Sequence, residues 1–397
     1  MQKGTTSGAR KGTVPGRVAF GVQKGTVPFS LRENWDSPRA ARSVEKARSF
    51  TVDKGQERVT RRKFHKVGSL AVASAVTGVA GKAVAAEAKA EPTMEPEKVR
   101  GYQEKMGYRR LGKTNLWISE ISLGGHCPQI PQNPSALENA DAIVENRRRV
   151  LARANELGIN FIDTDMAKEC RVYGQALKEL KLRDQFYISF DSWATGFPEE
   201  RRKEGESRKQ HWLRLVDNRL RDYHTDHLDF WRPVSCMELD EMVEAFEVMH
   251  RAGKVRFLAV SNHDPEKIKQ IAAHPSGKIS MVLFPYFTMT KESESGVLAA
   301  CKKQDLGVIA IKPLSAGFLA QEGRTMKHLK KVLLTPNLSA AIPGVKNVEQ
   351  LEENVQASYT RDVPLTKKEL EELAVETRDL FDRLPPRYQW LRRWEYV

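Results

Sequence analysis

Cysteine is scarce in this sequence, and its spacing excludes the common metal clusters. The 397 residues contain four cysteines, Cys127, Cys170, Cys236 and Cys301, and no two of them form a C-x-x-C pair. Iron–sulfur and structural zinc sites need several thiolates that converge on one metal, so we expect no metal site. A chain of this length also buries enough surface to fold without a disulfide framework.

The sequence also lacks a long apolar run. A membrane-spanning helix needs about 20 apolar residues, and no such uncharged stretch occurs, so we expect no stable membrane anchor in the mature chain. Positive charge is concentrated at one end: residues 1–85 hold 17 Lys or Arg and 5 Asp or Glu, a net of +12 of the total +14. The rest of the chain is therefore near neutral, which does not favour a nucleic-acid-binding surface.

Residues 1–58 form a basic, low-complexity tract. The string Lys-Gly-Thr-Val-Pro occurs at 11–15 and again at 24–28. Such a tract buries little apolar surface, so we expect a disordered leader. The alternative is that translation starts at Val59 and that residues 1–58 are not made.

Residues 59–85 predict a twin-arginine export signal. Arg61 and Arg62 precede a weakly apolar stretch, Val67 to Gly81, and the small-residue pattern Ala83-Val84-Ala85 follows. The order of basic, apolar and small residues is typical of a cleaved signal. It predicts that the twin-arginine export machinery carries the folded protein to the periplasm or another extracytoplasmic space. The alternative is an alanine-rich cytoplasmic helix, which Gly68 and Gly78 disfavour.

Beyond a linker at 86–105, short apolar runs alternate with helical patterns over residues 106–363. This alternation indicates βαβ units and a parallel sheet. The candidate strands are Ile118–Leu123, Asn160–Thr164, Phe186–Phe190, Leu228–Trp231, Phe257–Ser261, Met281–Pro285, Val308–Ile311 and Ala340–Ile342. Eight such units predict an α/β fold, a (β/α)₈ TIM barrel, whose active site lies at the carboxyl ends of the strands.

Two additions flank the predicted barrel. A short hairpin is expected around Gly107–Thr114, before the first barrel strand. Residues 364–397 are expected to form a C-terminal helix over Lys367–Arg383, which a Thr366–Glu369 capping box begins, and an aromatic, basic tail. We expect this tail to pack on the surface of the barrel.

Five segments resemble the aldo/keto reductase superfamily, in the right order and mostly at predicted strand ends. They are RLGKTNL at 110–116, GINFIDT at 158–164, GKVRFLAVSN at 253–262, KPLSAG at 312–317, and IPG at 342–344 followed by Glu353-Asn354. The resemblance covers about residues 106–375. It implies a nicotinamide nucleotide cofactor and hydride transfer to or from a small-molecule carbonyl or alcohol.

The resemblance places the cofactor on residues that follow three of the predicted strands. A donor–acceptor pair suits the nicotinamide carboxamide, and a loop with glycine lets backbone N–H groups approach the pyrophosphate. The residues carried over are Ser261 and Asn262 for the carboxamide, Pro313, Leu314 and Gly317 for the pyrophosphate, and Glu353 and Asn354 for the adenine, with Lys312, Gly344 and Lys346 beside them. Lys346 is the candidate for a 2′-phosphate, so NADP is expected, with NAD possible.

On the catalytic side, only one of four positions matches. The family uses an aspartate, a tyrosine, a lysine and a histidine. Asp163 retains the aspartate, and the other three positions fall on Lys168, Asp191 and Val234. In the family, the tyrosine gives a proton to the carbonyl oxygen. Here Asp163 and Asp191 are expected to raise the pKa of Lys168, which would make it a reluctant donor near neutral pH.

Two histidines are alternative proton donors. His126 and His263 each follow a predicted strand, and an imidazole pKa near 6.5 suits acid–base catalysis. The alternative for each is a merely solvated loop histidine, which is the more common role of a lone loop histidine. The expected cluster of Asp163, Lys168 and Asp191 also has a structural alternative, an ion-paired plug in the mouth of the barrel.

Three functions remain open. The first is an NAD(P)-dependent oxidoreductase of the aldo/keto reductase type with a rebuilt catalytic site. The second is a catalytically degenerate nucleotide-binding protein that acts as a sensor or scaffold. The third is a non-redox lyase or isomerase that uses Asp163, Lys168 and Asp191. We favour the first because the resemblance spans the whole barrel, while fold alone does not determine function.

Overall fold

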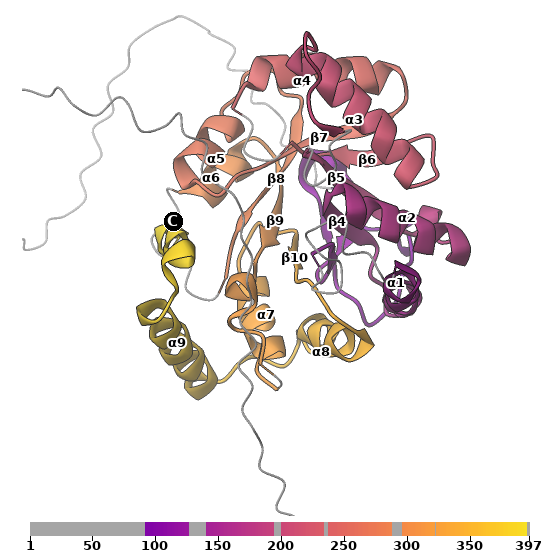
Figure 1. Ribbon diagram of the computed structural model, residues 1–397. Helices are drawn as coiled ribbons and strands as arrows, with labels where there is room; N and C mark the ends of the chain where they lie inside the picture. Colours follow the sequence, from indigo (N-terminus) through magenta and orange to yellow (C-terminus); the bar gives the residue numbers. More distant parts are fainter. Residues whose placement is uncertain are drawn as a thin grey trace, which may run out of the picture. The chain divides into compact units, whose positions relative to one another are not determined.

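A computed structural model describes residues 92–126, 140–193, 200–233, 237–287, 296–321 and 323–394 (Figure 1). The predicted leader and export signal, residues 1–85, lie outside these ranges. Cys127, Val234 and Cys236 lie outside them as well. The two described cysteines, Cys170 and Cys301, are buried free thiols.

Eight parallel strands form the barrel. They are β3 (Leu123–Gly124), β4 (Phe161–Met166), β5 (Tyr187–Trp193), β6 (Leu228–Trp231), β7 (Val255–Ser261), β8 (Ile279–Pro285), β9 (Gly307–Ile311) and β10 (Ala340–Ile342), each paired with its neighbours in the chain. Parallel bridges from Ile121 to Ala341 and from Gly124 to Gly344 join the first segment to the last. These bridges close the ring, and the predicted TIM barrel is confirmed.

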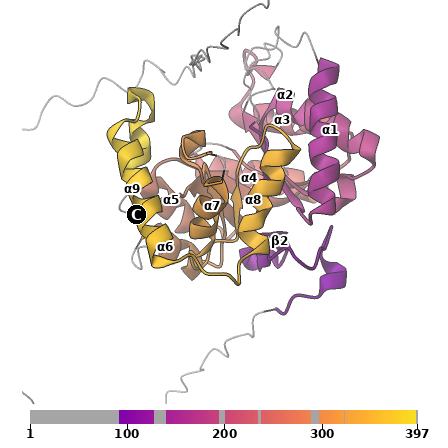
Figure 2. The same ribbon diagram turned by 90° about the horizontal axis from the view of Figure 1, so that it is seen from below.

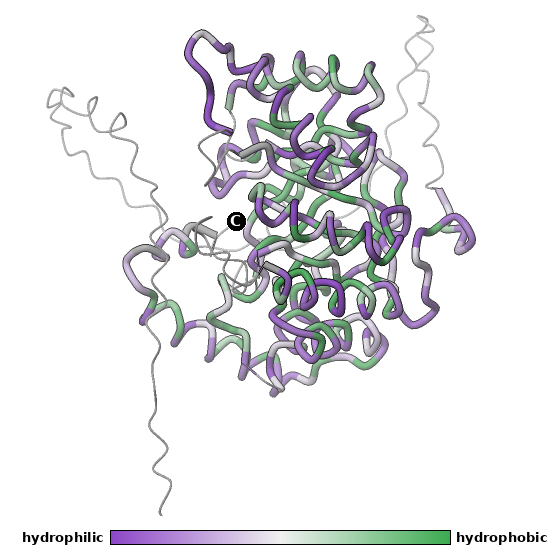
Figure 3. Tube along the Cα trace, turned by 45° about the vertical axis from the view of Figure 1, so that its right-hand side comes forward, coloured by the Kyte–Doolittle hydropathy of each residue, from purple (hydrophilic) through white to green (hydrophobic). Residues whose placement is uncertain are grey.

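Helices surround the strands, as Figures 1 and 2 show. They are α1 (Ala140–Glu156), α2 (Ala167–Leu180), α3 (Arg208–Asp222), α4 (Leu239–Arg251), α5 (Pro265–Ala272), α6 (Val297–Lys303), α7 (Thr325–Leu333) and α8 (Val348–Tyr359), and α9 (Lys367–Asp382) follows the barrel. The hydropathy alternates along these helices because one side of each faces the sheet (Figure 3). Within the described ranges, no helix is long and apolar enough to cross a membrane.

Side chains cap the starts of three helices. Asp264 caps α5 by accepting from the backbone N–H of Glu266, and Asn347 caps α8 by accepting from that of Gln350. Thr366 and Glu369 form the predicted capping box of α9. These caps satisfy backbone donors that a helix leaves unpaired at its start.

Side-chain alternation along the strands gives the protein two apolar cores. Successive side chains of a strand point to opposite faces, so one set fills the barrel and the other packs under the helices. The interior set includes Phe161, Tyr187, Phe230, Met281 and Ile309. A larger cluster lies between the strands and the surrounding helices.

The segment before the barrel differs from the prediction. The expected first strand, Ile118–Leu123, is divided: β2 (Trp117–Ser119) pairs with β1 (Tyr108–Arg110) in an antiparallel hairpin, and only β3 enters the barrel. The side chain of Asn160 accepts a hydrogen bond from the backbone N–H of Ser119 at 2.9 Å. The chain therefore leaves the hairpin at Ser119, and a continuous apolar run in the sequence does not reveal this break.

Candidate functional site

Acidic and polar side chains converge at the carboxyl ends of two neighbouring strands. Asp163 and Asp165 lie on the same face of β4 as the interior residue Phe161, because strand side chains alternate with a period of two. On β5, Ser189 is paired in register with Asp163, and Asp191 lies two residues further along. All four side chains therefore belong to the barrel interior at its carboxyl end, where barrel enzymes place their chemistry.

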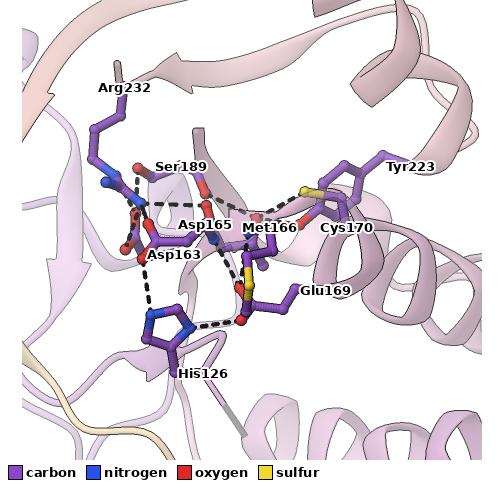
Figure 4. Close-up of polar contacts among 10 residues, drawn as sticks. His126, Asp163, Asp165, Met166, Glu169, Cys170, Ser189, Tyr223 and Arg232 are labelled. Atoms are coloured by element: carbon purple, nitrogen blue, oxygen red, sulfur yellow. Dashed lines mark hydrogen bonds and ion pairs between the residues drawn. The ribbon is translucent and has the colours of Figure 1, made fainter. Parts of the chain in front are cut away.

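Arg232 ties this cluster together. It follows β6 directly and is 2% exposed. Its Nε donates to Oδ1 of Asp163 at 2.8 Å and its Nη2 donates to Oδ2 at 3.1 Å, and it also forms an ion pair with Asp165 (Figure 4). Ser189 donates to Asp163 at 2.6 Å. The partners of Asp163 are therefore an arginine and a serine, which the sequence analysis did not identify.

His126 reaches the same cluster from the other side. Its Nε2 lies 3.0 Å from Oδ2 of Asp165, and its Nδ1 lies 2.6 Å from Oε1 of Glu169. The preceding Gly125 permits this approach, because a Cβ there would stand 2.7 Å from the backbone oxygen of Asp163. About half of the His126 side chain remains exposed. The ring is thus held by two carboxylates and still faces solvent.

Glu169 is fixed by the start of α2. Its side chain is almost fully buried, and its Oε2 accepts from the backbone N–H groups of Asp165 at 2.8 Å and Met166 at 3.2 Å. A carboxylate in the first helical turn is stabilised by the helix dipole and by unpaired N–H groups. Glu169 therefore presents its second oxygen to His126 from a rigid position.

These contacts shift the pKa values of the cluster in opposite directions. Burial raises the pKa of Asp163 to about 6, against the opposing effect of Arg232. Burial also acts to raise the pKa of Asp165, but Arg232 and His126 together bring it well below its usual range. The charge of Glu169 raises the pKa of His126 well above 6.5, and Asp165 adds to this effect. The site therefore holds alternating charges at neutral pH.

Lys168 does not join this cluster, contrary to the prediction. It is the second residue of α2 and is 2% exposed, and its Nζ has no hydrogen-bond partner among the described residues. Burial lowers its pKa to about 8, and the carboxylate that opposes this shift is Glu169. The expected rise in the pKa of Lys168, caused by Asp163 and Asp191, is therefore wrong. Asp191 instead adds its charge to the environment of Arg232, whose pKa is raised.

His263 follows β7 by two residues and is covered by the C-terminal tail. Its ring stacks on that of Trp390 with centroids 4.6 Å apart and an interplanar angle of 1°. Trp390 belongs to a 3₁₀ segment, Pro386–Trp394, after α9. Burial lowers the pKa of His263 to about 3, and Lys312 reinforces the shift. His263 is therefore neutral, and the tail packs on the barrel beside the site.

The loop after β9 has a left-handed backbone at four residues. Lys312, Ser315, Ala316 and Gly317 all have positive φ values, of 51°, 49°, 57° and 93°. The backbone N–H groups of Ser315 and Gly317 donate to the carbonyl oxygens of Lys312 and Leu314, at 2.8 Å and 2.9 Å. Pro313 and Leu314 of the same loop are buried. Ser315 is fully buried, and its Oγ has no hydrogen-bond partner among the described residues.

Further polar groups lie where the nucleotide was predicted. Ser261 and Asn262 are 2% and 3% exposed at the end of β7. Asn354, in α8, is 2% exposed and its Oδ1 is without a hydrogen-bond partner within the described chain. A buried polar atom without a partner costs free energy, and a bound amide or adenine amino group would satisfy it. These residues fit a nicotinamide nucleotide.

Three other predicted cofactor residues have structural contacts. A Cβ at Gly344 would stand 2.4 Å from the backbone oxygen of His126, so this glycine allows the barrel to close beside His126. Glu353 accepts from the backbone N–H of Gly323 at 3.1 Å. Lys346 is exposed just before α8, and Arg147 donates to its backbone oxygen at 2.9 Å. Lys346 alone of these three presents a basic side chain near a helix start.

Comparison with known proteins identifies the class that this barrel and its site define. A model of the aldo/keto reductase family matches residues 139–340, about half of the chain. The chain therefore belongs to the aldo/keto reductase family, and the predicted resemblance is confirmed.

Individual relatives are distant. "Uncharacterized oxidoreductase YqkF" of Bacillus subtilis is 24% identical over 69% of this chain and 97% of its own length, and L-galactose dehydrogenase of Arabidopsis thaliana is 23% identical over 64% and 88%. Among solved structures, aldo-keto reductase AKR11C1 from Bacillus halodurans has a TM-score of 0.53 at 21% identity, covering 68% of this chain and 96% of that one. An aldo-keto reductase from Klebsiella pneumoniae in complex with NADPH has the same TM-score at 24% identity, covering 68% and 94%. At these identities the solved structures support the fold.

Proposed function

We propose that this protein is an NADP(H)-dependent oxidoreductase that transfers hydride between a nicotinamide nucleotide and a small-molecule carbonyl or alcohol. The observation that carries the proposal is a pair of buried polar atoms, Ser315 Oγ and Asn354 Oδ1, which have no hydrogen-bond partner in the part of the chain that the structure describes and which lie in elements that would contact the nucleotide. Ser315 belongs to the left-handed loop at 312–317, where the family resemblance would place the pyrophosphate.

When bound, the nucleotide would supply or accept the hydride, and the chain's own residues would supply the remaining interactions. Ser261 and Asn262 would hold the carboxamide, and Lys312 would add positive charge near the phosphates. Arg232 remains positively charged at the end of β6 because it forms ion pairs with Asp163 and Asp165. Arg232 thereby offsets carboxylate charge that would otherwise oppose the developing negative charge of a reduced carbonyl oxygen.

The preference for NADP over NAD rests on Lys346. Its side chain is exposed at the start of α8, where a helix N-terminus also favours a phosphate. The relative yakc of Schizosaccharomyces pombe is named as an aldo-keto reductase of NADP(+), at 23% identity. We expect NADPH to bind more tightly than NADH, and Lys346→Ala to reduce that difference.

Fluorescence titration of the purified protein with NADPH and with NADH tests the proposal. Micromolar binding of NADPH, followed by its oxidation with a panel of small aldehydes and ketones, would support an oxidoreductase. Binding without turnover would favour a nucleotide-binding sensor or scaffold. If neither nucleotide binds, the proposed function fails.

We also propose that the twin-arginine signal predicted at 59–85 exports the folded protein. The pattern of Arg61, Arg62 and the small residues Ala83 to Ala85 supports this proposal. Cell fractionation of the native host would place the mature chain outside the cytoplasm. The paired change Arg61→Lys with Arg62→Lys should retain it inside, and export of that variant would contradict the proposal.

A further inference from the structure

The His126 imidazole is the group of the cluster that is both charged and open to solvent. Its two ring nitrogens meet two carboxylates of different character, Glu169 at 2.6 Å and Asp165 at 3.0 Å. Glu169 is 1% exposed at its side chain, whereas Asp165 is 24% exposed. One partner is therefore immobilised in the protein, and the other lies at the edge of the open site.

The other basic side chains near the site are less suited to give a proton to a substrate. Arg232 is held by Asp163 and Asp165, and a guanidinium does not release its proton in proteins. His263 is neutral beneath Trp390. Lys168 lies on α2 and is 2% exposed, so it is less accessible to a substrate than the half-exposed ring of His126. Among the described residues, His126 is therefore the group best placed to give up a proton at the mouth of the barrel.

We propose that His126 is the proton donor to the substrate oxygen and that Glu169 is the residue that positions it. This inference rests on the proposed oxidoreductase function. It goes beyond that function because it assigns the acid to a histidine after β3 and gives a role to a glutamate of α2.

The geometry sets the direction of proton transfer. Glu169 accepts from Nδ1 and is itself held by two backbone N–H groups, so it keeps the ring in one orientation. The substrate oxygen replaces Asp165 at Nε2, and Asp165 retains its ion pair with Arg232. The Nε2 proton then moves to the oxygen as the carbonyl carbon receives the hydride. The ring is left neutral with its proton on Nδ1, and solvent returns the lost proton through the exposed side.

The electrostatics of the surrounding elements support a charged ring before transfer. Glu169 of α2 and Asp165 of β4 raise the pKa of His126 well above 6.5. Arg232 after β6 forms an ion pair with Asp165. His263 after β7 is neutral because burial lowers its pKa, and Lys312 after β9 lowers that pKa further. At neutral pH the imidazolium form is therefore populated, as a general acid requires.

The test compares the full-length wild type with His126→Gln and Glu169→Gln. His227→Gln is the matched control, because Nδ1 of His227 also meets a carboxylate, Asp226 at 2.7 Å, in a loop that precedes β6. The readouts are NADPH affinity by fluorescence, NADPH oxidation with a panel of small aldehydes, and nitrogen-15 NMR of the imidazoles in the nucleotide-free protein. Thermal melting establishes that each variant is folded.

We expect His126→Gln to lower turnover by roughly 10²–10⁴-fold with NADPH affinity unchanged, and His227→Gln to match the wild type. NMR should show that neutral His126 carries its proton on Nδ1, and that Glu169→Gln lowers the pKa of His126. Full turnover in His126→Gln, or a neutral ring protonated on Nε2, would overturn the inference while leaving NADPH binding intact. Failure of the wild type to bind NADPH or to reduce any aldehyde would overturn the proposed function, and this inference with it.

Discussion

Arg232 donates to both carboxylate oxygens of Asp163, from Nε at 2.8 Å and from Nη2 at 3.1 Å. Such two-point contacts combine charge with a fixed planar geometry. Both residues are more than nine-tenths buried. Because an unpaired buried charge destabilises the folded state, each of the two charges needs the other. The pair anchors Asp165 and, through it, His126.

Arg232→Met should therefore destabilise the protein strongly. The change leaves Asp163 buried without its counter-ion, and breaking a buried pair in this way costs about 3–5 kcal/mol of unfolding free energy. Urea unfolding followed by circular dichroism measures the loss. Arg251→Met, at a side chain that is 71% exposed, is the control and should cost less than about 0.5 kcal/mol. A small loss in Arg232→Met would show that the pair is not needed to hold Asp163.

Lys168→Met should stabilise the protein near neutral pH. Burial lowers the pKa of Lys168 from 10.5 to about 8, so the unfolded state binds more protons than the folded state between these values. The stability of the wild type must then rise with pH across this window, by linkage. Replacing the buried amine with an apolar side chain of similar length should add about 2 kcal/mol at pH 7, and the gain should shrink as the pH rises from about 8 to 10.5. A gain in stability that does not change with pH would contradict the conclusion that the buried, charged amine of Lys168 destabilises the folded state.

Asn354→Leu should separate stability from cofactor affinity. The Oδ1 of Asn354 is buried without a hydrogen-bond partner among the described residues, so an apolar side chain of similar size relieves an unpaired acceptor. We expect unchanged or higher thermal stability and a roughly tenfold weaker affinity for NADPH. The measurements are thermal melting and fluorescence titration. Unchanged NADPH affinity would mean that Oδ1 of Asn354 does not accept a hydrogen bond from the nucleotide.

Trp390→Ala should uncover His263. Stacking by Trp390 and burial keep the pKa of His263 near 3, and removing the indole lets water reach the ring. The pKa of His263 should then rise toward its ordinary value of about 6.5, which NMR titration of the imidazole detects. Val375→Ala, at an exposed position of α9, is the control for a change in the C-terminal extension. An unshifted pKa in Trp390→Ala would show that Lys312 and the barrel residues alone keep His263 neutral.

The fold follows from local patterns in the sequence. Eight apolar runs with helices between them determine a parallel barrel, because parallel strands need crossover connections and both faces of the sheet must be covered. The start of α9 was predicted from Thr366 and Glu369, since a cap is a contact between near neighbours. The hairpin boundary was not predicted, because Ser119 is fixed by Asn160 from 41 residues away.

The sequence by itself also determined that Asp163 and His126 lie at strand ends, and its resemblance to the family predicts a nucleotide at the loops after β7 and β9. Only the tertiary structure decided which charges meet. Arg232 and Glu169 had no motif to mark them, and Lys168 was expected beside Asp163 from its spacing alone. Spacing assigns a residue to an element, but the direction of a side chain depends on how that element is turned. Lys168 lies at the start of helix α2. Arg232 directly follows strand β6 and its side chain points toward the axis of the barrel, so the arginine is the residue that pairs with Asp163.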